Sequence, residues 1–323
     1  MRSLNRPAGQ PRENWRAALA PVPHYTQKRR DVRDNLAFSR TLARLALRSL
    51  YQELVLYPKP GLVSLVDNGS HRDMDASTFM RSLFSLRRYF FLIAEAGMQG
   101  APFKYLQRLA IAAEERMLRA TGGVNTHRGA IFALGMLCAA MAYCRAQKMP
   151  LSDASIRATL LIQWGDALAS HTHADAQGQA SHGQQVAAAH AVGGAREEGA
   201  LGFPSVFEIA LPRMRQTLEH GRDWQEAKID ALFALMQHVS DTNVYHRGGE
   251  QGAALVRGRS ADFLAAGGTA NPGWHAMAID CHRAFVAQRL SPGGAADLLA
   301  AACLVHQACA LGEGSGLPLR GRG

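Results

Sequence analysis

The sequence lacks the common signatures of nucleotide-binding and hydrolase folds. It contains no G-x-x-x-x-G-K-[ST] phosphate loop, no strand-linked G-x-G-x-x-G segment and no G-x-S-x-G nucleophile elbow. These absences exclude a P-loop NTPase, a Rossmann-type dehydrogenase and an α/β-hydrolase. Any nucleotide site in this chain must therefore be built from helix ends, basic side chains and carboxylates that hold a metal ion.

Cysteine is scarce, and no two cysteines are spaced for a metal site. The cysteines are odd in number, form no C-x-x-C pair and lie in apolar, helix-like runs. This pattern predicts buried, reduced thiols rather than a zinc site or a disulfide framework. The five are Cys138, Cys144, Cys281, Cys303 and Cys309.

Long apolar runs are also missing. No apolar stretch approaches the roughly 20 residues that are needed to span a bilayer. The first residues show no apolar signal region before a small-residue cleavage site. We therefore expect a cytoplasmic protein without a membrane span.

The net charge of +10 is concentrated near the N-terminus. Residues 1–50 contain eleven Lys or Arg and three Asp or Glu residues, so they carry +8 of the excess. We interpret residues 1–33 as a basic, flexible extension rather than as a basic face of the folded body. The remainder predicts a helical catalytic domain over residues 34–311 and a flexible tail, rich in Gly, Pro and Arg, over residues 312–323.

Apolar residues recur at intervals of three and four along most of the chain, which is the period of an amphipathic helix. Alanine is abundant, and no segment shows the convincing alternation of a strand. Pro204 and Pro292 stand where a first helical turn would begin, and Ser291 is a good N-cap residue. We predict an all-α fold, a single globular domain of about ten helices whose polar loops converge on one site. The expected helices cover residues 42–54, 79–94, 104–120, 129–146, 153–169, 204–219, 224–239, 252–266, 274–289 and 292–310.

Five polar segments, punctuated by Gly or Pro, lie at the ends of the expected helices. A core helix does not need such a cluster at its entrance, whereas a site for a polar, anionic ligand does. Carboxylates suit Mg²⁺ that bridges phosphates, and Lys and Arg side chains suit phosphate oxygens. The segments are residues 58–61 with 69–75, 123–129, 194–198, 241–249 and 290–297. Their acids and neighbouring acids are Glu53, Asp73, Asp75, Glu198, Asp241 and Asp297, and their bases are Lys59, Arg128, Arg196 and Arg247.

A histidine-rich stretch follows the expected helix at 153–169. His171, His173 and Asp175 alternate, and His182 and His190 come after them. Alternation in a polar loop gives no fixed ligand geometry, so we interpret this stretch as a solvated loop rather than a metal site.

The polar segments carry motifs in a definite order. They are Pro58-Lys59-Pro60-Gly61-Leu62-Val63, Gly69-x-His71-x-Asp73-Met74, Gly123-Val124-Asn125-Thr126-His127-x-Gly129, Gly194-Ala195-Arg196-x-Glu198, Asp241-Thr242-Asn243, Arg247-Gly248-Gly249 and Leu290-Ser291-Pro292-Gly293-Gly294. In order and spacing this set resembles the triphosphoribosyl-dephospho-CoA synthases. The likeness covers about residues 40–310 and leaves the N-terminal extension outside.

The resemblance implies a reaction in which ATP and 3′-dephospho-CoA give 2′-(5″-triphosphoribosyl)-3′-dephospho-CoA and adenine. It also implies that the product passes to a carrier-protein transferase, because the family supplies the prosthetic group of citrate lyase and malonate decarboxylase. The family is helical, in agreement with the periodicity. A protein that performs this reaction must hold the triphosphate, help adenine leave and take a proton from a hydroxyl group.

These requirements suggest roles for the motif residues. Mg²⁺ on the triphosphate would be held by some of Asp73, Glu198 and Asp241. Either His71 or His127 would be the base, because a histidine pKa lies near working pH, and Asp73 is a third catalytic candidate. The residues expected to bind ATP or dephospho-CoA are Lys59, Asn125, Thr126, Arg196, Asn243, Arg247, Ser291, Gly293 and Gly294.

Two positions depart from the family pattern. After Pro-Gly-Leu-Val the citrate-lyase type usually reads Asp-Arg-x-Asn, whereas this chain has Ser-Leu-Val-Asp-Asn at residues 64–68. This variant looks more like the malonate decarboxylase branch. Glu197 adds a charge beside Glu198, where the family often has a small residue.

Two other classes of protein remain as alternatives. One is a metal-dependent N-glycoside hydrolase on a helical scaffold, which would release adenine from ATP without an acceptor. The other is a nucleic-acid-binding module that uses the basic N-terminus, whose binding would depend steeply on salt and vanish without residues 1–33. The distribution of charge disfavours the second alternative, because the folded body carries little of the excess.

The basic extension provides a first prediction. Because residues 1–33 lie outside the likeness, their deletion should leave turnover of ATP and dephospho-CoA within a few-fold of the full chain. Steady-state rates of both proteins test this. Complete loss of turnover with the helical circular dichroism intact would mean that the segment contributes to the site.

Overall fold

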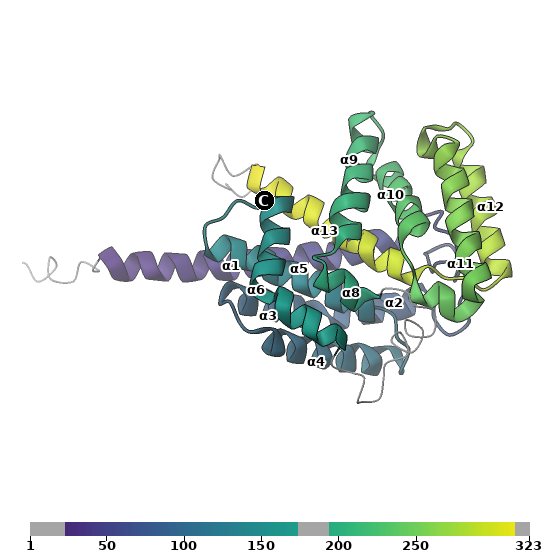
Figure 1. Cartoon of the computed structure of the whole chain (residues 1–323). Helices are drawn as coiled ribbons and strands as arrows, with labels where there is room; N and C mark the ends of the chain where they lie inside the picture. The colour runs from purple at the N-terminus through teal and green to yellow at the C-terminus, as the bar shows by residue number, and fades with distance from the viewer. Residues whose placement is uncertain (1–22, 174–193, 314–323) are drawn as a thin grey trace, which may run out of the picture.

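A computed structural model describes residues 23–173 and 194–313, and within these ranges it contains twelve α-helices and no β-strand (Figure 1). This confirms the predicted all-α, single-domain class. The helices are α1 (Pro23–Leu54), α2 (Ala76–Ser85), α3 (Arg87–Met98), α4 (Phe103–Thr121), α5 (Arg128–Ala146), α6 (Asp153–His173), α8 (Ala195–Ala200), α9 (Leu211–Glu219), α10 (Trp224–His238), α11 (Thr242–Ala265), α12 (Trp274–Ala287) and α13 (Gly293–Glu313). A π-helical turn, η2 (Ser205–Ala210), and a 3₁₀ turn, η3 (Gly268–Ala270), complete the set.

The α5 helix lies at the centre of the core because its side chains are nearly all apolar and many are small. Thirteen of its nineteen residues are buried. Helix α3 crosses it closely at Gly97, where a Cβ atom would overlap the backbone of Ala139. The Tyr89 hydroxyl on α3 donates to the Ile131 carbonyl at 2.8 Å, so this buried polar group is satisfied. The crossing fixes the N-terminal end of α5, where the 123–129 motif enters the fold.

The α13 helix is a second apolar core element, and it packs along α1 and α5. By length and composition, Arg128–Ala146 and Gly293–Leu311 are both apolar enough to cross a membrane. This differs from the sequence expectation that no such run exists. Of these two stretches, 72% and 67% are buried inside the protein, and this burial accounts for their composition.

Helices α9 to α12 stand together at one end of the molecule, beside the start of α13 (Figure 1). Helix α11 is interrupted at Gly249, whose φ of 57° and ψ of −155° lie outside the helical region. The interruption separates a short first segment, which carries Asn243 and Arg247, from the long second segment. The sequence pattern predicted a polar loop here, before a helix at 252–266, but the capped N-terminus makes this first segment helical.

Other elements differ in extent from those expected. The helix predicted over 79–94 is divided into α2 and α3, which meet at Leu86. The helix predicted over 204–219 starts with the π-helical turn η2, and the short helix α8 was not expected. Helix α6 continues to His173, so residues 170–173 are helical rather than part of a loop. The remaining His-rich residues, Asp175, His182 and His190, lie outside the described ranges.

Helix α1 begins at Pro23, eleven residues before residue 34, where charge composition placed the start of the helical domain. Proline is favourable in a first helical turn, and no further proline or glycine interrupts the chain before residue 58. Residue 33 is therefore not the edge of a structural element.

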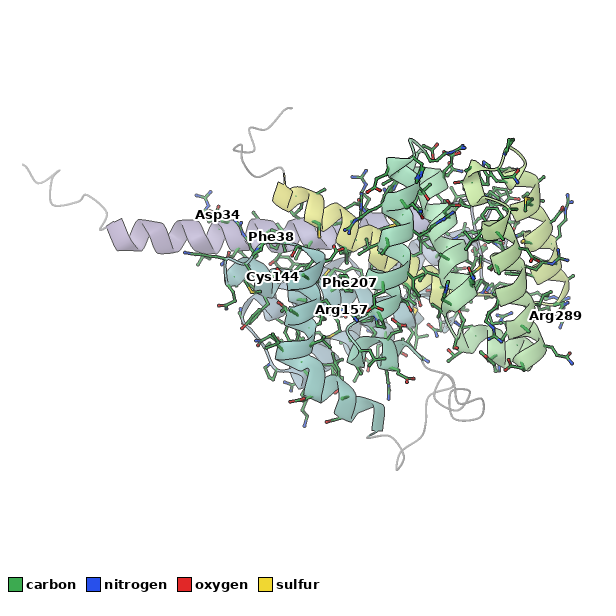
Figure 2. All side chains as sticks on the ribbon, turned by 45° about the horizontal axis from the view of Figure 1, so that its top comes forward. Asp34, Phe38, Cys144, Arg157, Phe207 and Arg289 are labelled. Carbon is green, nitrogen blue, oxygen red and sulfur yellow. The ribbon has the colours of Figure 1, made fainter. Side chains whose placement is uncertain are left out.

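The cysteines are buried and form no disulfide, as predicted. Cys144, for example, packs against α6, where its sulfur lies 3.2 Å from the Thr159 hydroxyl. Figure 2 shows Cys144 and Phe38 toward one end of the molecule and Arg289 at the other. Arg289 immediately precedes the 290–297 motif, so Cys144 lies away from the converging motifs.

Candidate active site

The N-terminal ends of α5, α11 and α13 meet, and glycines at these ends permit the close approach. A Cβ atom at Gly129 of α5 would overlap the carboxylate of Asp297 on α13. A Cβ atom at Gly294 of α13 would lie 3.0 Å from a carboxylate oxygen of Asp241, which precedes α11. Helix α8 starts nearby, because a Cβ atom at Gly194 would lie 3.8 Å from the Thr242 side chain. Four of the five polar segments are thus brought together.

The fifth segment, the loop between α1 and α2, joins this group at residues 290–291. Gly61 has a φ of 71°, and a Cβ atom there would overlap the Leu290 carbonyl. The Ser70 hydroxyl donates to the same carbonyl at 2.5 Å. His71 Nε2 lies 2.8 Å from the Ser291 hydroxyl oxygen. The loop is therefore bonded directly to the start of α13.

Arg247 holds the same loop from the side of α11. Its Nη1 donates to the Ser70 carbonyl at 3.1 Å and to the Arg289 carbonyl at 3.3 Å, and its Nη2 lies 3.2 Å from His71 Nδ1. Burial first, and then the Arg247 charge, lower the pKa of His71. Because Arg247 donates to Nδ1, the ring proton lies on Nε2 and faces Ser291. His71 is thus a neutral imidazole with both nitrogens engaged.

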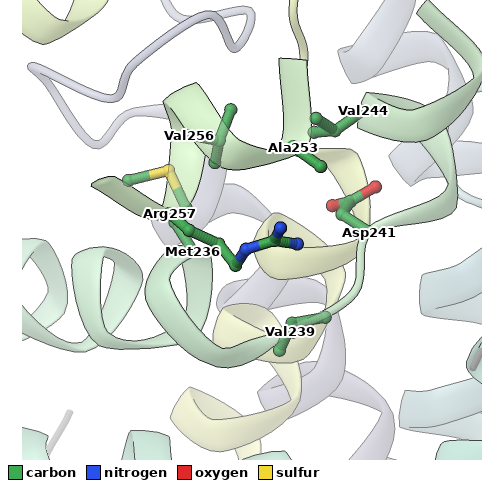
Figure 3. A pocket seen from close by; sticks show the side chains of 7 residues that line it. All are labelled: Met236, Val239, Asp241, Val244, Ala253, Val256 and Arg257. Atoms are coloured by element: carbon green, nitrogen blue, oxygen red, sulfur yellow. The ribbon is translucent and has the colours of Figure 1, made fainter. Parts of the chain in front are cut away.

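Asp241 caps two helices at once. Its Oδ1 accepts from the Asn243 backbone N–H at 2.9 Å, and its Oδ2 accepts from the Ala295 backbone N–H at 3.0 Å. The side chain is buried, and burial raises its pKa, while the backbone N–H groups act in the opposite direction. Beside it lies a cavity of about 10 Å³ that is also lined by Met236 and Arg257 (Figure 3), which is the size of one water molecule. Both carboxylate oxygens therefore serve the fold.

Asp297 occupies the equivalent place at the start of α5. It is partly buried, its carboxylate rests on Gly129, and it receives a hydrogen bond from the Ala130 backbone N–H. Burial, followed by the charges of Glu53 and Asp241, raises its pKa well above the usual range of an aspartate. The sequence alone marks this acid as one of the site acids without a specific role. A sequence signal was present, because it is the one charged residue in the apolar stretch Gly293–Leu311.

His127 is the N-cap residue of α5 and is buried. The Thr126 hydroxyl donates to Ser82 Oγ at 2.6 Å, and Ser82 Oγ lies 2.6 Å from His127 Nδ1. Since Ser82 accepts from Thr126, its own proton is directed to Nδ1, and the ring proton of His127 lies on Nε2. Nε2 is buried and has no partner. Burial, and then the Lys59 charge, lower its pKa to about 3, so His127 is a neutral hydrogen-bond donor.

Lys59 does not lie where a phosphate ligand requires it. It is 1% exposed, and its Nζ lies 2.5 Å from Glu53 Oε1 in a buried ion pair. Burial lowers its pKa despite this partner. The prediction that Lys59 binds ATP or dephospho-CoA is therefore not supported by its position. Lys59 and Glu53 form a buried ion pair beneath the helix ends.

The remaining sequence-predicted residues lie near the helix ends. Asn125 is exposed, and its Oδ1 accepts from the Arg128 backbone N–H at 3.2 Å. Arg128 itself pairs with Glu114 on α4. The Asn243 side chain is exposed against Gly293, where a Cβ atom would lie 2.9 Å from its amide nitrogen. Partly buried Arg196 lies in the first turn of α8.

The three acids proposed to hold Mg²⁺ do not form a preformed metal centre. Within residues 23–173 and 194–313, no group of three or more His, Cys, Asp and Glu side chains is arranged to hold a metal ion. Glu198 accepts from the Ser205 hydroxyl at 2.5 Å and from its backbone N–H at 3.2 Å, and burial raises its pKa. Asp241 is engaged by backbone N–H groups. Asp73 differs, because its side chain is 60% exposed and its Oδ1 lies 3.6 Å from His71 Nδ1.

A cavity of about 350 Å³ lies between α1, α10 and α13, and it is separate from the converging helix ends. Its lining includes Gln52, Trp224 and His306, and none of the sequence-predicted site residues. We therefore place the candidate site at the helix ends, where the motif residues are in contact.

The chain was compared with known proteins. Residues 39–315 match the family model described as CitG, ATP:dephospho-CoA triphosphoribosyl transferase. A probable 2-(5″-triphosphoribosyl)-3′-dephosphocoenzyme-A synthase of Acinetobacter calcoaceticus is 39% identical over 255 residues, which are 79% of this chain and 86% of that protein. The synthase of Pectobacterium atrosepticum is 38% identical over 264 residues, 80% and 86% of the two chains. No solved structure matches.

The two ring nitrogens of His127 provide a prediction. Glutamine places an amide N–H near the position of Nε2, whereas asparagine places its amide near Nδ1, beside Ser82. If the Nε2 proton serves a ligand, His127→Gln should keep more activity than His127→Asn, which should lose about 10²-fold or more in adenine release. Thermal melts of both variants are the control. Equal rates in the two variants, or better activity of the asparagine variant, would assign His127 a purely structural role through Ser82.

Proposed function

The chain belongs to the ATP:dephospho-CoA triphosphoribosyl transferase family, and we propose that it converts ATP and 3′-dephospho-CoA into 2′-(5″-triphosphoribosyl)-3′-dephospho-CoA and adenine. One observation carries this proposal: the family match spans residues 39–315, and the motifs within it, far apart in sequence, meet at the starts of α5, α11 and α13. Both substrates are small molecules.

The reaction is an N-glycosyl transfer. The bond between C1″ of the ATP ribose and N9 of adenine breaks, and the 2′-hydroxyl of dephospho-CoA bonds to C1″. The transition state should resemble an oxocarbenium ion, by analogy with glycoside chemistry. The protein must therefore hold the highly charged triphosphate, orient the acceptor hydroxyl and manage one proton.

Arg247 and Arg196 are the residues that we propose for the triphosphate. Arg247 is exposed, and a guanidinium has five N–H donors. Its bonds to two carbonyls and His71 orient it without using this whole capacity. Arg196 lies at the start of α8, which is adjacent to the start of α11. The exposed Asn125 and Asn243 are placed to hydrogen-bond the ribose or adenine.

We propose that Mg²⁺ binds together with the triphosphate rather than in a preformed protein site. Mg²⁺ keeps several waters and commonly takes one or two carboxylates plus substrate phosphates. Of the three acids considered, exposed Asp73 fits this part, since the oxygens of Glu198 and Asp241 already accept hydrogen bonds. The ion would neutralise triphosphate charge.

We place the enzyme in the supply of a carrier-protein prosthetic group. Its product would pass to a transferase that loads the acyl carrier subunit of malonate decarboxylase. The support for this branch, rather than citrate lyase, is the Ser64–Asn68 segment that replaces the usual Asp-Arg-x-Asn. We expect the protein to act in the cytoplasm, as the sequence predicts.

The product is the direct test of this function. Incubation with ATP, Mg²⁺ and dephospho-CoA should release adenine and yield a conjugate whose mass equals both substrates minus adenine, measured by mass spectrometry. ATP alone should give little adenine. Adenine release that is independent of dephospho-CoA would instead identify an N-glycoside hydrolase.

The acids should separate into two classes when they are replaced. Asp73→Asn should raise the Mg²⁺ concentration for half-maximal rate several-fold and leave the melting temperature unchanged, because its side chain is exposed. Asp241→Asn should lower the free energy of unfolding by about 1–3 kcal/mol, since the amide nitrogen cannot accept the backbone N–H groups. Rates against Mg²⁺ concentration and urea unfolding measure the two effects. An unchanged Mg²⁺ dependence in Asp73→Asn would remove Asp73 from the metal assignment.

A further inference from the structure

We propose that Asp297 is the general acid that gives a proton to adenine as it leaves C1″. This inference rests on the proposed function, and it adds a catalytic residue to the site. It arises from the placement of Asp297, a residue that is only partly buried, at the meeting point of α5 and α13.

Specific contacts fix the position of the Asp297 carboxyl group. Its carboxyl lies directly on Gly129, at a contact that no other residue type would permit. The Ala130 backbone N–H donates to it, which fixes its orientation. Residues 293 and 294, one turn earlier on α13, are both glycines, so no side chain of that turn covers the group. Asp297 sits among motif residues, and the residue as a whole is only partly buried.

Its charged surroundings favour the protonated form. Burial first, and then the charges of Glu53 on α1 and Asp241 at the start of α11, raise the pKa of Asp297 well above the usual range of an aspartate. Lys59 is paired with Glu53 and offsets part of that charge. From α5 the neighbouring His127 is neutral, with a pKa lowered to about 3. A carboxylic acid kept protonated in this way can donate a proton at neutral pH.

The other candidates are less suited to this task. Asp241 has both oxygens bonded to the backbone, and both nitrogens of His71 are engaged by Arg247 and Ser291. His127 would have to become positively charged to act as an acid, and burial opposes that charge. Asp297 is therefore the group of this cluster that combines a proton, a fixed position and access.

The proposed step balances in atoms and electrons. The C1″–N9 electron pair passes to adenine as that bond breaks, and the Asp297 proton moves to a ring nitrogen of adenine. The 2′-hydroxyl oxygen of dephospho-CoA bonds to C1″ and loses its proton. That proton returns to the Asp297 carboxylate, directly or through water, and restores the acid. The net change moves one proton from the acceptor hydroxyl to adenine.

The test compares two leaving groups in Asp297→Asn. Asparagine keeps the shape and an oxygen that accepts the Ala130 N–H, but it has no acidic proton to give. With ATP, adenine release should fall by about 10²- to 10⁴-fold. With nicotinamide riboside 5′-triphosphate the base leaves as a neutral molecule without protonation, so the rate should stay within a few-fold of wild type. The rate of adenine release from ATP by the wild type should also fall as the pH rises through the raised pKa of Asp297. This fall in rate should be absent in Asp297→Asn.

Asp230→Asn is the matched control. Asp230 likewise accepts a backbone N–H, from Thr269 at 2.8 Å, but it is buried and pairs with Arg213 on the α9–α10 side of the fold. Its replacement should lower the melting temperature and change the rates with the two triphosphates by the same factor. Circular dichroism of all variants shows whether the fold is kept.

The outcomes separate the inference from the function. If wild type releases no adenine from ATP and dephospho-CoA, the proposed function is wrong. If wild type is active and Asp297→Asn slows both triphosphates equally, the residue only positions the helix ends and the acid role is overturned. Selective loss with ATP supports the acid role.

Discussion

Three helices in this protein start at one place, and that arrangement requires neutralisation of their ends. Each helix N-terminus carries unpaired N–H groups and a partial positive charge. Asp241 bonds to the first turns of both α11 and α13, and Asp297 bonds to the first turn of α5. The Asp241 carboxylate offsets the positive ends of α11 and α13, and the protonated Asp297 carboxyl group accepts an N–H of α5, so the three helix ends can meet at the site.

The meeting of the helix ends gives Asp241 and Asp297 different roles. Asp241 is buried and its oxygens are saturated, so it serves the fold. Asp297 is only partly buried as a residue, and its carboxyl group carries a raised pKa because of burial and, after that, the nearby charges of Glu53 and Asp241. The acids that stabilise the helix ends therefore also raise the pKa of one of their own members, Asp297. Beneath them lies the buried ion pair of Glu53 and Lys59.

Much of this could be predicted from the sequence. The helical class, the buried thiols and the site segments follow from periodicity, apolar context and glycine placement. Individual roles could not, because they depend on burial. Lys59 is basic and lies in a motif, yet a tertiary partner, Glu53, holds it inside. Ser291, Gly293 and Gly294 were predicted to bind ATP or dephospho-CoA, but Asp241, 54 residues before Ala295, already accepts the Ala295 N–H at the same helix start. The sequence suggested that His127 is a base. Its contact with Ser82 of α2, which places the ring proton on Nε2, shows instead that it is a hydrogen-bond donor.

The central claim is that Asp241 joins the starts of α11 and α13. Amide hydrogen exchange, measured residue by residue by NMR on the full chain, tests it most directly. First-turn amides of helices normally exchange fast because they have no partner. The backbone N–H groups of Asn243 and Ala295 should instead be strongly protected, like those inside a helix. Exchange of both amides at the rate of open helix ends would contradict this account.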